Sequence, residues 1–306
     1  MGERFAIGLD LGGTELKAVR LSSALRIERF LARPSGVREA REAPFASLVE
    51  CAAVLLDGRG EDAVGVGCGC PGVIRPDDGS LVDRTAHLPH WQETPLRAEL
   101  VERLHLPVAV DNDANLAALA EHRLGAARGA RVCVAITLGT GVGCGIVIEG
   151  RIFRGAWGGA GELGHVPLGP GASVCACGVA HCAEAEASAA GLALAARGLG
   201  LEPPEPATVF ARAAAGETAT VAAVERFTDR LGALVATAVD LLNPDVVVLG
   251  GGLARSGETW IDGLRRAVDR HALASHTRGL RIELAALGER AGAVGAALMA
   301  WDAFGA

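Results

Sequence analysis

A glycine-rich turn between two apolar runs occurs twice in the chain, and this repeat constrains the fold more than any other feature. The two segments are IGLDLGGTELKAV, at 7–19, and AITLGTGVGCGIV, at 135–147. Each pattern predicts a strand, a turn rich in Gly and Thr, and a second strand. Two such units predict two similar halves that face each other across a cleft. Chance similarity between two glycine hairpins is the alternative.

The rest of the chain alternates strand-like and helix-like segments, which indicates an α/β protein. Thr94 is expected to cap, and Pro95 to open, a helix that carries Leu96, Leu100 and Leu104. A long helix should stop at Asn243, before Pro244. Further helices are expected over 45–56, 114–125, 219–242 and 292–304, and further strands over 63–70, 108–113, 245–252 and 280–287.

Charge and hydropathy exclude two classes of partner. The 306 residues include 29 Lys+Arg and 36 Asp+Glu, a net charge of -7, whereas a nucleic-acid binder needs a basic face. The longest uncharged run, 132–148, is interrupted by glycines and falls short of the roughly 20 apolar residues that span a bilayer. Glu3, Arg4 and Asp10 leave no apolar signal core. We therefore expect a cytoplasmic protein with no membrane partner, whose eight cysteines are not paired as disulfides.

Three glycine-rich turns follow apolar strands, at 10–14, 138–143 and 249–252. Glycine permits positive φ and lets an anion approach the backbone N–H groups, so these turns predict binding of nucleotide phosphates. Asp10 ends a strand, where its carboxylate could bind Mg²⁺ or a water on it. Simple hairpin connections remain the alternative. A Walker A loop is excluded, because Lys17 is the only lysine.

The segment GCGCPG at 67–72 satisfies the dinucleotide pattern G-x-G-x-x-G literally. That fingerprint must open a helix, whose N-terminus holds the pyrophosphate. Pro71 interrupts the segment, and VIRPDDGS follows with no helical period. Dinucleotide binding is therefore not expected.

A His and three Cys in a turn-rich segment predict a zinc site. His165, Cys175, Cys177 and Cys182 offer four ligands of the type that structural Zn²⁺ takes. His181 is a competing ligand, although its adjacency to Cys182 strains a tetrahedral site. With all four positions filled by protein, the zinc would be structural, which argues against a zinc-dependent hydrolase. The other five cysteines are expected to pack as small apolar residues: Cys51, Cys68, Cys70, Cys133 and Cys144.

Acidic residues gather in two further segments. In VDNDAN, Asp111, Asn112 and Asp113 stand between a strand and a helix. One of them could cap the helix, and a carboxylate at this strand end is also where a general base would sit. Glu162 precedes His165 by three residues, and Glu184 follows Cys182 by two. Carboxylates and an imidazole on a metal-braced loop suit a polyhydroxyl ligand.

Together these motifs resemble the ROK family of sugar kinases, in the superfamily of sugar kinases, Hsc70 and actin. The resemblance covers nearly the whole chain and implies a two-lobed, actin-like ATPase (ribonuclease H-like) α/β fold. DLGGT and LGTGVGCG resemble the family's two phosphate motifs, VVVLGGGL its adenosine-side motif, DNDAN its catalytic segment, and GELGH…CACG…HCAE its sugar-and-zinc segment. The implied lobes are 1–112 with 291–306, and 113–290 with a zinc loop at 165–182.

The resemblance also implies site residues. Asp113 is the implied catalytic base, and the last helix is expected to return to the N-terminal lobe. The implied sugar contacts are Gly72, Thr85, Asn112, Asp113, Glu162, His165 and Glu184. The implied contacts to Mg-ATP are Asp10, Gly12, Gly13, Thr14, Gly139, Thr140, Gly141, Gly251 and Gly252.

These residues predict an ATP-dependent hexose kinase that phosphorylates a sugar hydroxyl, with C6 of glucose the first choice. N-acetylmannosamine, N-acetylglucosamine and allose are the alternative acceptors, and a non-catalytic sugar sensor is the alternative of another class. A homodimer is expected from the family. Its repressors carry an additional N-terminal DNA-binding region, which this chain is not expected to have. The chain departs from the family in having His181 where Gly is usual and His87 where Asn is frequent.

Overall fold

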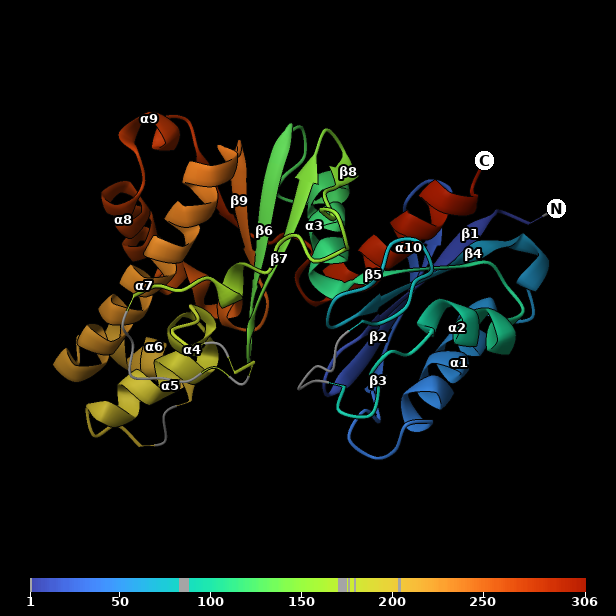
Figure 1. Ribbon diagram of the computed structural model, residues 1–306, viewed down its shortest axis with the longest axis horizontal. Coiled ribbons are helices and arrows are strands. Elements are labelled where there is room, and N and C mark those ends of the chain that lie inside the picture. The colour runs from blue at the N-terminus through green and yellow to red at the C-terminus, as the bar shows by residue number, and fades with distance from the viewer. Residues whose placement is uncertain (1, 83–87, 170–174, 176, 179, 203–204) are drawn as a thin grey trace. The chain divides into compact units, whose positions relative to one another are not determined.

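The computed structural model describes residues 2–306 apart from 83–87, 170–174, 176, 179 and 203–204. The chain forms two compact units (Figure 1). The first unit consists of Met1–Gly125, Gly150–Ala160 and Leu287–Ala306, and the second of Ala126–Glu149 and Gly161–Ala286. The boundary expected between 112 and 113 therefore falls inside the first unit, because the helix that begins there packs on the core of that unit.

A five-stranded mixed sheet forms the centre of the first unit, in the order β3-β2-β1-β4-β5. β2 is antiparallel to both β1 and β3, whereas β4 runs parallel to both β1 and β5. The strands are β1 (Phe5–Leu11), β2 (Glu15–Ser22), β3 (Ile27–Pro34), β4 (Ala63–Cys70) and β5 (Val108–Asn112). The sequence does not indicate β3, because charged residues interrupt its apolar pattern and most of its side chains are partly exposed at the sheet edge.

Helices cover both faces of this sheet (Figure 1). One core lies under α1 (Ala43–Leu56) and α2 (Leu96–Leu104), and the other under α3 (Asp113–Leu124) and α10 (Ala291–Phe304). Alternate residues of β1 point to the two cores, as expected for a strand that is buried on both faces. The last helix thus returns to the first unit.

The packing of α10 on the sheet requires glycine at two positions. A Cβ on Gly8 of β1 would overlap the carbonyl oxygen of Ala293, and a Cβ on Gly67 of β4 would overlap that of Ala296. Gly295 of α10 meets the Leu116 backbone of α3 in the same way. These three glycines therefore allow backbones of different elements to approach one another closely.

The sheet of the second unit repeats the order of the first. Its order is β10-β9-β6-β7-β8, with β6 antiparallel to β7 and parallel to β9, and β9 parallel to β10. The predicted repeat is therefore confirmed as a shared topology, in which β6 and β7 correspond to β1 and β2. The strands are β6 (Val132–Leu138), β7 (Val142–Ile148), β8 (Arg151–Ile152), β9 (Val246–Gly250) and β10 (Arg281–Leu284).

The helices of the second unit, apart from the short helix 274–277, contribute residues to a core that includes residues of β6, β7 and β9. They are α4 (Glu184–Ala187), α5 (Ala189–Gly198), α6 (Pro206–Ala214), α7 (Thr218–Leu242), α8 (Ile261–His271) and α9 (Ala274–Thr277). The long helix α7 ends as predicted, since Asn243 adopts φ 44° just before Pro244. None of the described helices is long and apolar enough to cross a membrane.

The start of α2 differs from the prediction. The helix begins at Leu96, its N-cap is Pro95, and no side chain makes a capping hydrogen bond. Thr94 instead belongs to an isolated bridge, in which its carbonyl accepts a hydrogen bond from the Leu81 N–H at 2.9 Å. This pairing keeps Thr94 outside the helix.

Candidate active site and metal centre

Two acidic residues, Asp10 and Asp113, lie close together at the ends of parallel strands in the first unit. The register pairs Asp10 of β1 with Gly69 of β4, and Gly69 with Asp111 of β5. A Cβ on Gly69 would lie 3.4 Å from Asp10 Oδ1 and 3.6 Å from the Cα of Asp113, the first residue of α3. The predicted Mg²⁺ ligand and the predicted base therefore both lie beside a residue that has no side chain.

The electrostatics of this pair favour a cation. Burial, and then the charge of Asp113, raise the pKa of Asp10 from 3.8 to about 7, while Lys17 lowers it. Gly292, in the first turn of α10, lies directly against the Asp10 carboxylate. Mg²⁺ prefers carboxylate oxygens, and its charge would offset the repulsion between two neighbouring acids. These residues fit a magnesium site.

Asn112 is the residue that caps α3. Its Oδ1 accepts hydrogen bonds from the N–H groups of Ala114, at 2.9 Å, and Asn115, at 3.2 Å. Its Nδ2 donates to the carbonyl of Gly72 at 3.1 Å, and Gly72 adopts φ 99°. The structure thus brings three predicted sugar contacts of this unit together: Gly72, Asn112 and Asp113. Thr85 and His87 lie outside the described residues.

Asp111 takes a role that the sequence does not indicate. Its side chain is buried and forms an ion pair with Arg154, with a shortest distance of 2.6 Å. Arg154 belongs to no recognisable motif, and the two residues are far apart in the sequence. The only hint of this pair in the sequence is that VDNDAN contains two aspartates, Asp111 and Asp113, whereas a general base requires only one.

The glycine turns of the second unit lie side by side. A Cβ on Gly251, which has φ 83°, would overlap the Leu138 backbone, so the turn after β9 packs on the turn after β6. A Cβ on Gly139 or Gly252 would have no neighbouring atom within 4 Å. Of the two predicted reasons for glycine, positive φ is wrong at Gly12, Gly139 and Gly141, because none of the three adopts it. The other reason, approach of an anion to the backbone N–H groups, stays a prediction.

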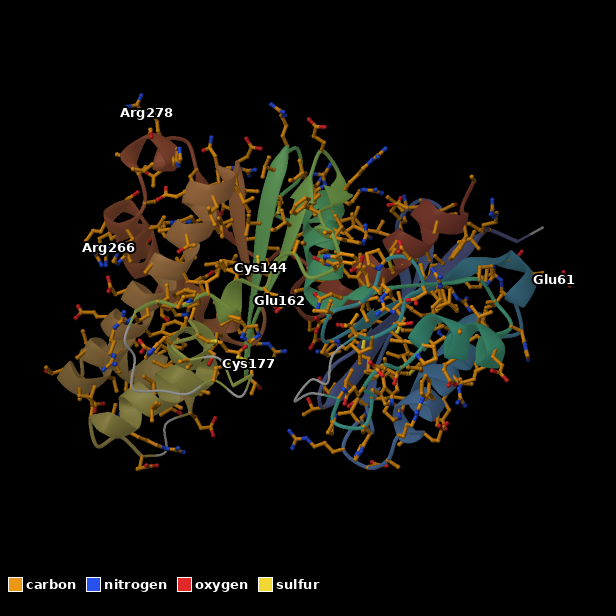
Figure 2. The ribbon with its side chains drawn as sticks, viewed as in Figure 1. Glu61, Cys144, Glu162, Cys177, Arg266 and Arg278 are labelled. Atoms are coloured by element: carbon orange, nitrogen blue, oxygen red, sulfur yellow. The ribbon has the colours of Figure 1, made fainter. Side chains whose placement is uncertain are left out.

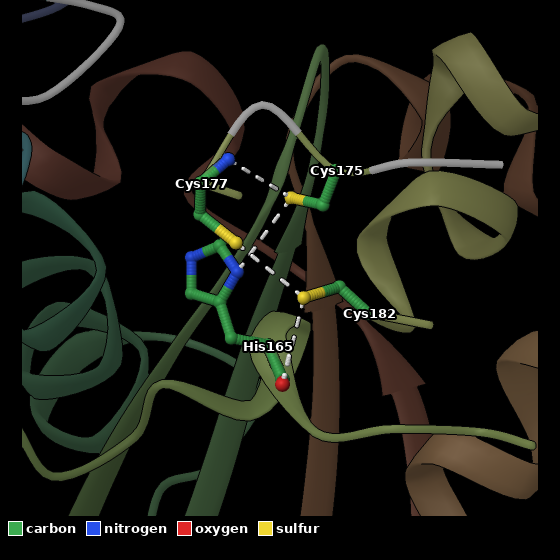
Figure 3. Close-up of side chains that lie close together, drawn as sticks. All are labelled: His165, Cys175, Cys177 and Cys182. Atoms are coloured by element: carbon green, nitrogen blue, oxygen red, sulfur yellow. Dashed lines mark hydrogen bonds between the residues drawn. The ribbon is translucent and has the colours of Figure 1, made fainter. Parts of the chain in front are cut away.

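The predicted zinc ligands converge in the second unit (Figure 3). The side-chain donor atoms of His165, Cys175, Cys177 and Cys182 all lie within 4.8 Å of one another. Cys175 Sγ is 3.9 Å from His165 Nδ1, and Cys177 Sγ is 3.5 Å from Cys182 Sγ. Thiolates bound to one zinc at about 2.3 Å lie about 4 Å apart, so the four residues fit a tetrahedral Zn²⁺ site.

His181 is not a member of this group. It adopts φ 64°, the left-handed conformation that glycine favours. The turn therefore has the backbone conformation suited to the glycine that is usual in the family, although His181 occupies the position. The other five cysteines are buried in the apolar cores, as predicted.

Glu162 and Glu184 flank the zinc ligands in different ways. Glu162 follows Gly161, which packs on the Cys144 carbonyl of β7. In the view of Figure 2, Glu162 is seen between Cys144 and Cys177. Its Oε2 lies 3.7 Å from His165 Nε2. Glu184 instead accepts a hydrogen bond from the Val142 N–H at 2.9 Å, and its other oxygen lies 3.4 Å from Cys175 Sγ.

Comparisons with known proteins agree with this architecture. The ROK family profile matches residues 6–303. The chain is 34% identical to a glucokinase of Halalkalibacterium halodurans, over 96% of this chain and 94% of that protein. It is 35% identical to an N-acetylmannosamine kinase of Citrobacter koseri, over 96% of this chain and 98% of that protein.

One solved structure is a ROK family glucokinase from Streptomyces griseus in complex with glucose and AMPPNP. It is 30% identical to this chain, has a TM-score of 0.84, and covers 97% of this chain and 99% of its own. The expected actin-like ATPase fold is thereby confirmed. This chain belongs to the ROK family.

Proposed function

We propose that this chain transfers the γ-phosphoryl group of Mg-ATP to a hydroxyl of a hexose, with C6 of glucose as the first candidate. The broader assignment is that it is an ATP-dependent sugar kinase, because its relatives over almost the whole chain include several glucokinases and one such structure holds glucose and an ATP analogue. The observation that carries the proposal is the meeting of Asp10 and Asp113 beside Gly69 at the strand ends of the first unit.

In the proposed reaction Asp113 accepts or orients the proton of the acceptor hydroxyl. The hydroxyl oxygen forms a bond to the γ-phosphorus while the bond to the bridging oxygen breaks, and ADP leaves with that electron pair. Asn112 and Gly72, joined by a hydrogen bond, would hold the sugar beside Asp113. Most of the rate enhancement would come from positioning.

Two metals fit the residues present. Asp10 would hold Mg²⁺ or a water bound to it, and the ion would supply positive charge to the transferring phosphoryl group. His165, Cys175, Cys177 and Cys182 would hold a structural zinc that fixes the loop carrying Glu184. The proposed contacts of ATP are Gly12, Gly13, Thr14, Gly139, Thr140, Gly141, Gly251 and Gly252.

The proposed sugar contacts are Gly72, Thr85, Asn112, Asp113, Glu162, His165 and Glu184. They do not by themselves select one sugar, and the relatives include a glucokinase and an N-acetylmannosamine kinase. Glucose is therefore proposed first, and N-acetylmannosamine, N-acetylglucosamine and allose are the alternatives. Dependence on ATP supports a cytoplasmic location, and a homodimer is proposed from the family.

The test is ADP formation over a panel of these sugars. Asp113→Asn should lose about 10²- to 10⁴-fold in kcat, because the proton acceptor is removed while the shape is kept. Asp78→Asn, at an exposed turn of the same unit, is the matched control and should keep full activity. An Asp113→Asn variant that retains most activity would remove Asp113 from its role. Sugar binding without ADP formation across the panel would favour a sensor.

A further inference from the structure

We propose that Arg154 and Asp111 are positioning residues, which hold Asn112 and Asp113 in place for phosphoryl transfer. This inference rests on the proposed function of Asp113. Neither side chain is among the predicted contacts to sugar, ATP or metal. They act on the start of α3, which carries the proposed base.

The two carboxylate oxygens of Asp111 bind partners of different kinds. Its Oδ2 accepts hydrogen bonds from Arg154, with the Nε atom at 2.7 Å and the Nη2 atom at 2.6 Å. Its Oδ1 accepts from the Asn112 N–H at 2.7 Å and from Asn115 Nδ2 at 2.9 Å. Arg154 therefore holds one oxygen while the other fixes the first turn of α3.

Burial makes Arg154 necessary for this arrangement. Asp111 is only 3% exposed, and a buried carboxylate is stable in its charged form only with a cation or several donors. Arg154 supplies a planar fork of donors, which also fixes the direction of the carboxylate. Without the guanidinium we expect Asp111 to turn toward water, which would release Asn112 and Asn115.

The segment that carries Arg154 is itself anchored. The Ala160 N–H donates to the Arg154 carbonyl at 3.2 Å, and Gly158, with φ 93°, packs against the Ile74 carbonyl. Two residues before Ile74, the Gly72 carbonyl accepts a hydrogen bond from Asn112. Three segments of the first unit therefore form a closed ring of contacts around Asn112, and the ion pair of Arg154 and Asp111 is one link in it.

A second Arg–Asp pair offers a matched control. Arg123, near the end of α3, binds Asp302 through two hydrogen bonds, of 3.1 and 2.8 Å. The side chains of Arg123 and Arg154 are equally exposed, at 33% and 35%, but that of Asp302 is 47% exposed and that of Asp111 only 5%. Arg123→Met therefore removes the same charge from the same unit without leaving a buried carboxylate unpaired.

The decisive kinetic comparison is Arg154→Met against Arg123→Met. We expect kcat to fall on the order of 10²-fold in Arg154→Met, with KM for ATP unchanged, because a small displacement of the base affects chemistry more than nucleotide binding. Arg123→Met should match the wild type. Millimolar guanidinium should restore part of the kcat of Arg154→Met, and Arg154→Lys should retain an intermediate kcat. Equal kcat in the two methionine variants would overturn the proposal.

A double-mutant cycle separates positioning from general damage. Asp111→Asn and Arg154→Met should have losses of kcat that are far from additive, because both break the same link. Losses that multiply, or a loss that neither guanidinium nor Lys restores, would overturn the proposal.

A measurement without turnover keeps the two proposals distinguishable. Hydrogen exchange of the Ala114 and Asn115 amides should be faster in Arg154→Met than in Arg123→Met, because Asn112 no longer caps them firmly. Unchanged exchange would overturn the positioning role. Absence of ADP formation by the wild type would instead overturn the proposed function, and the exchange result would stand independently of it.

Discussion

The Glu184 carboxylate accepts a hydrogen bond from the Val142 N–H at 2.9 Å. Glu184 lies two residues after Cys182, the last of the predicted zinc ligands. The bond therefore joins the predicted zinc loop to the glycine turn at 138–143. A Cβ on Gly141 would lie 2.5 Å from the same Glu184 oxygen, so any larger residue there would displace the carboxylate from its present position. The predicted sugar ligand and the predicted phosphate turn are therefore directly connected.

Replacement of Glu184 by Ala should therefore affect both substrates. We expect KM to rise for glucose, because a proposed contact is lost, and for ATP, because the turn loses its anchor. The combined loss in kcat/KM should be about 10-fold or more, as for a hydrogen bond to a charged group. Glu202→Ala, which removes only an exposed partner of Arg197, is the control. Unchanged KM values for both substrates would contradict this prediction.

Removal of a zinc ligand should lower stability and metal content together. Cys182→Ser should purify with less than one zinc per chain and should melt at a lower temperature, because bound metal contributes directly to folding free energy. Cys51→Ala is the control: Cys51 is a buried packing thiol, so this variant should keep its zinc and lose about 1 kcal/mol. Metal analysis and thermal unfolding test both variants. Wild-type protein purified without chelator and free of zinc would refute the site.

Stability should fall with rising pH through the ionisation of Asp10. The pKa of Asp10 is about 7 in the folded chain, against 3.8 for the free group, so the folded state binds the proton more tightly between these values. Ionisation therefore opposes folding increasingly as pH rises through this window, by at most about 4 kcal/mol above it. In the absence of magnesium, the stability of Asp10→Asn relative to the wild type should increase as the pH is raised from about 5 to about 8.

Chemical unfolding at both pH values measures this difference. Magnesium at the higher pH should stabilise the wild type more than Asp10→Asn, because the ion binds the charged carboxylate. The same pH slope in both proteins would show that Asp10 does not titrate in this window.

Addition of a methyl group at Gly8 should destabilise the first unit severely. The new Cβ of Gly8→Ala would overlap the Ala293 carbonyl of α10, where backbone rather than a flexible side chain must move. We expect a loss of about 3 kcal/mol or more in the free energy of unfolding. Gly60→Ala, with nothing within 4 Å and no positive φ, should change stability by less than about 0.5 kcal/mol. Equal melting temperatures for the two variants would refute the packing argument.

Much of the fold can be predicted from local patterns. The sequence indicates the two glycine hairpins, the long helix and its end at Asn243 correctly, because hydrophobic period, Gly and Pro act over a few residues. It also predicts the zinc ligands, because His165, Cys175, Cys177 and Cys182 lie close together along the chain in a polar segment where packing is a poor explanation. The structure brings their donor atoms within 4.8 Å of one another. The edge strand β3 and the start of α2 are not correctly predicted, because neighbouring backbone decides both.

What the sequence alone determined is the set of chemical groups: the glycine turns, the carboxylates of DNDAN and the predicted metal ligands. Only the tertiary structure decided how they are arranged. It placed Asp10 beside Gly69 through strand register, with the start of α3 against the same glycine, joined Glu184 to Val142, and brought Arg154 onto Asp111. It also gave a different reason for the glycines, several of which admit a neighbour and do not adopt positive φ. These relationships depend on residues that are distant in the chain, so no local pattern of the sequence can encode them.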